Sequence, residues 1–143
     1  MSISRKSFLP ILVAAGWLWG EPGLSIAQVE APASPLGIWR GDSKCTTDAS
    51  ACHDEHVVYY IEADPKMSSQ VIIRADKIVD GKAITMGVGP WIYDSRRQTL
   101  TFETNGRVWL VTLHGDRMEG TLTLSDMVVF RRMTLTRDPG QQH

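Results

Sequence analysis

The strongest constraint on the fold is a series of short runs, between residues 36 and 137, in which apolar and polar residues alternate. A period of two is typical of a β-strand with one face on a core and the other in solvent. Pairs such as Asp80-Gly81 and Asn105-Gly106 separate the runs and favour two-residue hairpin turns. We predict strands over Leu36–Lys44, His56–Ala63, Gln70–Val79, Lys82–Met86 leading into Trp91–Tyr93, Thr99–Glu103, Val108–His114, Arg117–Leu124 and Met127–Arg137.

Evenly spaced strands joined by tight turns are typical of an antiparallel meander. Eight such strands can close into a barrel, which removes the exposed edges of an open sheet. The predicted fold class is therefore all-β, an eight-stranded antiparallel up-and-down barrel. The segment Gly87-Val88-Gly89-Pro90 interrupts the fourth strand and predicts a bulge or a corner.

Side-chain parity divides the strands into an apolar face and a solvated face. A small closed barrel with one apolar face has an interior that is either packed with side chains or holds one small ligand. The predicted inward positions on the last two strands are Met118, Gly120, Leu122 and Leu124, followed by Val129, Arg131, Met133, Leu135 and Arg137.

The N-terminus has the three parts of a secretory signal: the basic Arg5 and Lys6, an apolar segment over residues 8–20, and small residues at Ser25 and Ala27. An apolar core this short does not span a bilayer comfortably. We therefore expect residues 1–28 to be a cleavable signal peptide and the protein to be periplasmic or secreted, without a stable membrane anchor. An uncleaved anchor is the alternative.

The remainder, about 115 residues, is enough for a single core. We predict a Pro/Ala linker over residues 29–35, a barrel domain over residues 36–138 and a disordered tail over residues 139–143. The formal net charge of −1, with both signs interspersed, gives no electrostatic footprint for nucleic acid or an anionic membrane.

Both cysteines of the chain, Cys45 and Cys52, flank a short loop. In an oxidising compartment this pair predicts a disulfide. The alternative is a zinc or copper site built from Cys52–His56. Because His53 is expected in the loop and His56 on the strand, their imidazoles would not converge, and we expect neither a metal nor a cofactor.

Gly37-Ile38-Trp39 resembles the G-x-W motif of the lipocalins and their calycin relatives. The cysteine pair, the following Asp-Glu and a strand rich in Val and Tyr resemble small secreted bacterial proteins with such barrels. The resemblance implies that Trp39 plugs one end of the barrel and that an arginine near the end of the last strand packs across it. Arg137 fits by parity, and Arg132 is the weaker candidate. The resemblance implies that the predicted barrel is lipocalin-like or avidin-like, although the chain is shorter than most lipocalins and lacks their T-D-Y motif.

No catalytic residues are predicted. The sequence contains no G-x-S-x-G or H-E-x-x-H motif. Asp54 and Glu55 are adjacent, and strand neighbours point to opposite faces, so they do not form an acid–base pair. The sequence therefore favours a protein that is not an enzyme.

The predicted ligand-binding residues are mostly aromatic residues on apolar strands. Aromatic rings with polar tips suit either a packed core or a pocket for a small hydrophobic or amphipathic molecule, whose polar end Tyr59 or Arg74 would fix. A slip of one residue would exchange Tyr59 with Tyr60. The set is Tyr59, Arg74, Trp91, Tyr93 and Trp109.

Three functions follow from the predicted barrel. The first is an exported lipocalin-like protein that binds a small apolar or amphipathic ligand. The second is a ligand-free barrel that binds a protein partner, as an inhibitor or an envelope assembly factor. The third is a metal-dependent or barrel-type enzyme, which would need His53, His56 and a carboxylate to converge.

Overall fold

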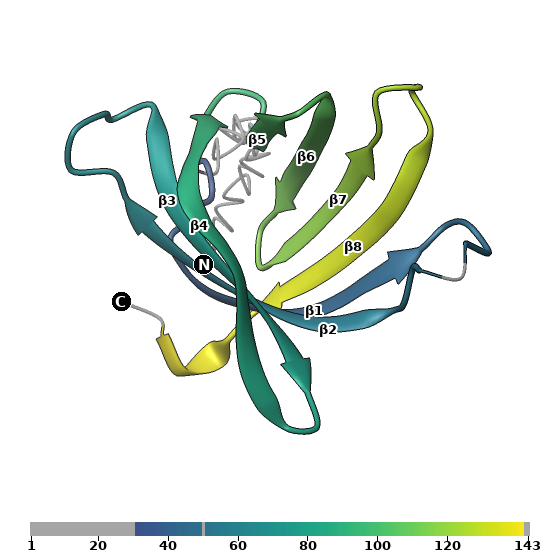
Figure 1. The fold of residues 1–143 in the computed structure, drawn as a ribbon. Helices are drawn as coiled ribbons and strands as arrows, with labels where there is room; N and C mark the ends of the chain where they lie inside the picture. Colours follow the sequence, from purple (N-terminus) through teal and green to yellow (C-terminus); the bar gives the residue numbers. More distant parts are fainter. Residues whose placement is uncertain (1–30, 50, 142–143) are drawn as a thin grey trace, which may run out of the picture. The chain divides into compact units, whose positions relative to one another are not determined.

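Eight antiparallel strands close into a barrel in the computed structural model, each paired with the next and β8 paired with β1 (Figure 1). This confirms the predicted all-β up-and-down barrel, and every predicted strand overlaps an observed one. The strands are β1 (Gly37–Cys45), β2 (Glu55–Ala63), β3 (Gln70–Val79), β4 (Lys82–Asp94), β5 (Thr99–Thr104), β6 (Arg107–His114), β7 (Arg117–Thr123) and β8 (Val129–Arg137).

The structure describes residues 31–49 and 51–141. The predicted signal peptide, the first two residues of the predicted linker and the last two residues of the chain lie outside this part. Pro139–Gln141 form one 3-10 turn, η1, where the sequence predicts a disordered tail. The backbone N–H of Gly140 donates a 3.2 Å hydrogen bond to Asp138 Oδ1 at this turn.

The core lies on the inward side of the strands, where parity places it. Met118 and Leu122 are buried, for example, whereas Glu119 between them is exposed. Apolar burial of this kind is the main term that stabilises a barrel. The core cluster comprises Trp39, Val57, Tyr59, Ile61, Val71, Ile73, Trp91, Leu100, Val111, Leu113, Met118, Met133 and Leu135.

The irregularity predicted in the fourth strand is a bulge at Met86, one residue before the predicted segment. Asp76 pairs with Thr85 and Ala75 pairs with Gly87, so Met86 has no partner in the ladder. The strand nevertheless continues through to Asp94. A bulge adds twist, and β4 bends along its length in Figure 1.

A second register shift corrects the parity assigned to β8. Leu122 pairs with Arg131 and Thr123 pairs with Val129, so Phe130 is the extra residue. Val129 therefore lies opposite Thr123 instead of continuing the inward set that includes Arg131. Strict alternation cannot anticipate such a shift.

One end of the barrel is covered by residues 33–36, which we call the N-terminal strap. Trp39 has no exposed surface, and its indole Nε1–H donates a 2.8 Å hydrogen bond to the Pro35 carbonyl. Part of the predicted linker is therefore fixed against the barrel. Arg137 donates to two further strap carbonyls, each at 2.6 Å, those of Ser34 and Leu36.

The weakest seam of the barrel lies between β4 and β5. Only three residue pairs join these strands, all at the Asp94 end, whereas β3 and β4 pair along ten positions. Beyond the last pair, Ile92 with Thr101, the two strands diverge, as Figure 1 shows. Along this divergence β4 has no neighbour on its β5 side within the described residues.

Candidate functional site

A cavity of about 390 Å³ lies inside the barrel beside the divergence of β4 and β5. Its volume falls in the lower part of the range of small-molecule sites. Residues from both sides of the divergence line it. The lining residues are Tyr59, Ile73, Ala75, Met86, Gly87, Val88, Gly89, Trp91, Phe102 and Trp109.

Three aromatic rings form one wall of the cavity. Trp91 stacks on Phe102 with ring centroids 5.4 Å apart and an interplanar angle of 22°, and its centroid lies 6.5 Å from that of Trp109. Phe102 and Trp109 are only partly buried. Aromatic faces that are supported from behind and open in front can stack on a ligand.

Two glycines of β4 form part of another wall. A Cβ atom added to Gly87 or to Gly89 would meet no other atom within 4 Å. Both glycines lie within β4, and neither has a positive φ. The space beside them is therefore open because the sequence places no side chain there, and a Cβ atom could be introduced without a clash.

Tyr59 is the only residue with a hydroxyl group among the described residues that line the cavity. The residue is 4 % exposed and its ring packs edge-on against Trp91 at 6.4 Å. Every fully buried side-chain N or O atom of the described residues has a hydrogen-bond partner. Tyr59 Oη makes no hydrogen bond to the described residues, so it is not one of these fully buried atoms. Part of the hydroxyl therefore faces open space, and the space that Tyr59 lines is the cavity.

Burial raises the pKa of Tyr59 well above its usual value, and the nearby Glu55 carboxylate raises this pKa further. The Arg131 guanidinium lowers the same pKa by a smaller amount. The group therefore stays a neutral phenol that can donate a hydrogen bond.

A cluster of charged residues lies near Tyr59, toward the end of the barrel opposite Trp39. Glu55 contacts Arg131 at 3.4 Å and Lys77 at 3.7 Å. Arg131 also donates to both oxygens of Ser43, each at 3.3 Å, and to the carbonyl of His53 at 3.0 Å. These contacts tie β8, β1, β2 and the β1–β2 loop together.

The structure brings together three of the five predicted ligand-binding residues, Tyr59, Trp91 and Trp109. Tyr93 does not line the cavity. Its hydroxyl donates a 3.0 Å hydrogen bond to the Ala33 carbonyl and accepts one from Gln98 Nε2. Tyr93 therefore anchors the strap side of the barrel.

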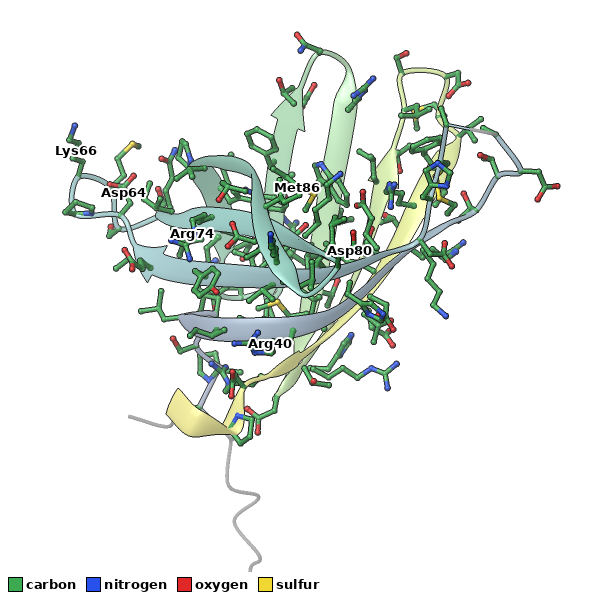
Figure 2. The ribbon with its side chains drawn as sticks, turned by 60° about the horizontal axis from the view of Figure 1, so that its bottom comes forward. Arg40, Asp64, Lys66, Arg74, Asp80 and Met86 are labelled. Carbon is green, nitrogen blue, oxygen red and sulfur yellow. A yellow bond between two sulfur atoms is a disulfide. The ribbon has the colours of Figure 1, made fainter. Side chains whose placement is uncertain are left out.

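Arg74 also lies outside the cavity, which corrects its predicted role. It pairs with Tyr60 on the outer face, and its guanidinium covers the Tyr60 ring at 3.9 Å. Figure 2 shows Arg74 on the outer side of β3. Because Arg74 is exposed and alternates with the buried Ile73, its side chain points away from the barrel interior and cannot fix a ligand there.

The sequence could have identified Phe102 as a lining residue, because it lies two residues after Leu100 on β5 and so shares its inward face. The glycines Gly87 and Gly89 were recognised only as a backbone irregularity. Their contribution to the cavity depends on which side of β4 faces inward, and the bulge at Met86 changes that parity midway along the strand.

The cysteines are joined by the predicted disulfide. Cys45 and Cys52 have Cα atoms 6.0 Å apart, and the described residues contain no free cysteine. His56 pairs with Asp42 on the outer face, and the imidazole is largely exposed. Across residues 31–49 and 51–141, no group of three His, Cys, Asp or Glu side chains converges as metal ligands would.

A second hollow of about 400 Å³ lies on the outside of the barrel, over β6, β7 and β8. Thr112, Glu119, Thr121, Arg132 and Thr134 contribute to it, and it is more polar and more open than the interior cavity. Small-molecule sites are enclosed and mostly apolar, so the interior cavity is the better candidate.

No helix in the described part of the chain is long and apolar enough to cross a membrane. No family model matches the sequence. No curated protein is similar enough to it to count as a match.

Proposed function

We propose that the protein is an exported lipocalin-like binding protein that holds one small hydrophobic or amphipathic ligand inside its barrel. The observation that carries this proposal is the interior cavity, which combines the Trp91, Phe102 and Trp109 rings with a Tyr59 hydroxyl that makes no hydrogen bond to the described residues. An apolar site with one well-placed polar group is the usual design of a small-molecule pocket.

The lipocalin-like assignment rests on the covered end of the barrel. Gly37 of the G-x-W motif has a φ of 121°, which a glycine adopts readily, and Arg137 lies across Trp39. Export is supported by the disulfide, which is typical of oxidising compartments, and by the signal-like N-terminal sequence.

The test is titration of the exported protein with an environment-sensitive apolar dye while tryptophan emission is recorded. We expect quenching at micromolar dye and a rise in melting temperature. The double variant Gly87→Val/Gly89→Val fills open space without backbone strain, so it should fold normally and lose the response.

Ile92→Val is the matched control, since Ile92 is 58 % exposed on the same strand and does not line the cavity. If the dye still quenches tryptophan emission in the glycine double variant, the dye binds outside the cavity. An absence of binding by fatty acids, retinoids and quinones would favour the protein-binding barrel instead.

A further inference from the structure

We infer that the ligand is a flat, uncharged ring system that carries a hydrogen-bond acceptor, such as a ring carbonyl. This inference rests on the proposed function and names the chemical class that the same cavity would select. It depends on the shape of the walls, on the charges near the hydroxyl and on the hydrogen that the hydroxyl can donate.

The shape of the cavity favours a flat molecule. On the β5 and β6 side it presents the rings of Phe102 and Trp109, with Trp91 packed against both. On the β4 side it presents Gly87 and Gly89, whose backbone carries no side chain into the space. A planar ring can stack on the aromatic side and lie against bare backbone on the other, whereas a flexible chain gains less from this geometry and loses more rotational freedom.

The charges favour a neutral molecule. Apart from the phenol of Tyr59, none of the described side chains that line the cavity is ionisable. The nearby cations, Arg131 and Lys77, both contact Glu55, and Arg131 is also occupied by three backbone or hydroxyl oxygens. At the Tyr59 hydroxyl the effect of Glu55 exceeds that of Arg131. A carboxylate or phosphate placed there would be repelled and would lose its hydration.

The hydroxyl of Tyr59 favours an acceptor on the ligand. It is a neutral phenol on the cavity wall, and it makes no hydrogen bond to the described residues. A ligand carbonyl would satisfy its hydrogen, whereas a plain hydrocarbon would displace water from it without replacing the lost bond.

Three molecules separate these features. The first, 9-fluorenone, is flat and has a carbonyl. The second, fluorene, has the same skeleton without the carbonyl, and the third, laurate, is a flexible anion. Each is titrated into the exported protein, with tryptophan quenching as the readout. We expect fluorenone to bind more tightly than laurate. Tyr59→Phe should lower the ratio of fluorenone to fluorene affinity about fivefold and leave fluorene binding unchanged.

Tyr60→Phe is the control, since Tyr60 is the adjacent tyrosine on the outer face, beneath Arg74, and should leave the ratio unchanged. Tighter binding of laurate, or a ratio that Tyr59→Phe does not alter, would overturn the inferred class while the ligand-binding function stands. Failure of all three molecules and of the apolar dye to bind would overturn the proposed function itself.

Discussion

The guanidinium of Arg137 lies across the indole of Trp39, with its Cζ atom 4.2 Å from the ring centroid. The two residues face each other across the β1–β8 pairing, which closes the barrel. Arg137 also contacts Asp116 at 2.8 Å, so this one side chain joins the last strand, the first strand, the strap and the β6–β7 turn. The contact predicted from parity and the G-x-W motif is present.

Trp39→Ala should lower the free energy of unfolding by about 3–5 kcal/mol, because it removes a completely buried indole. Arg137→Ala should cost less. The double variant should lose less than the sum of the two, since the residues share a contact. Urea denaturation of the four proteins measures all three values.

Arg137→Lys provides the control for charge, because lysine keeps the positive charge but lacks the planar fork that reaches two strap carbonyls. We expect the free energy of unfolding of Arg137→Lys to lie closer to that of Arg137→Ala than to that of the wild type. Simple additivity in the cycle would show that the stacked pair has no energetic role.

Removal of the disulfide by Cys45→Ser/Cys52→Ser should lower the free energy of unfolding by about 2 kcal/mol, mainly through greater freedom of the unfolded chain. The β1–β2 loop should also exchange its amide hydrogens faster, since the bond joins the end of β1 to the loop before β2. Chemical denaturation and hydrogen exchange test the two effects. Alkylation of two thiols in the untreated exported protein would contradict the disulfide.

Replacing each of three glycines, one at a time, by alanine should change the free energy of unfolding by very different amounts. A Cβ on Gly41 would lie 2.0 Å from the Thr134 carbonyl oxygen, and one on Gly120 would lie 2.8 Å from Val111 Cγ2. We expect Gly120→Ala to cost about 1–3 kcal/mol and Gly41→Ala to cost more, because it forces β1 away from β8.

Gly89→Ala is the matched comparison, because its Cβ would meet open space. It should leave the melting temperature unchanged or raise it, with a gain of at most about 1 kcal/mol from a less flexible unfolded chain. A loss as large as that of Gly120→Ala would mean that the wall of the cavity is closed beside Gly89.

Two aspartates should make the protein less stable in acid. Hydrogen bonding lowers the pKa of Asp94, chiefly from the Arg97 backbone N–H, and lowers that of Asp138, chiefly from the Arg40 side chain. Depressed carboxyl pKa values stabilise the fold above the unfolded value of about 3.9, and this contribution is lost as the pH falls through the folded values. The difference in melting temperature between wild type and Asp94→Asn/Asp138→Asn should therefore be largest near pH 7 and shrink below about pH 3. A constant difference down to pH 2 would contradict this linkage.

The strands and turns were predictable because they depend on local sequence. Asp80 and Gly81 both have positive φ, as do Asn105 and Gly106, which is the backbone of the two-residue hairpin that these pairs favour. Parity placed Leu100 on the core face, because a period of two needs no knowledge of distant contacts. It did not separate Tyr59 from Tyr60, and only the structure shows that Tyr59 is the buried one.

Local regularity does not determine which side chains line a site or which backbone groups a distant side chain binds. The role of Arg74 was chosen for its chemistry, although its neighbour in the ladder, Tyr60, belongs to the outer face. The strap at residues 33–36 has a composition typical of a linker, yet its carbonyls are held by Trp39 and Arg137. Carbonyl acceptors are common to every residue, so no sequence pattern distinguishes those that distant side chains will bind.

The pairing of β1 with β8 also determines when the barrel can be completed. A polypeptide is synthesised from its N-terminus, so β1 is made first and its partner β8 last. Until β8 is available, each partial sheet has unpaired edges, the strap lacks the Arg137 side chain and Trp39 lacks its cover. Pairings of such long sequence separation form slowly, and incomplete sheets are prone to associate with one another. The last strand therefore controls the transition from an aggregation-prone nascent chain to a closed barrel.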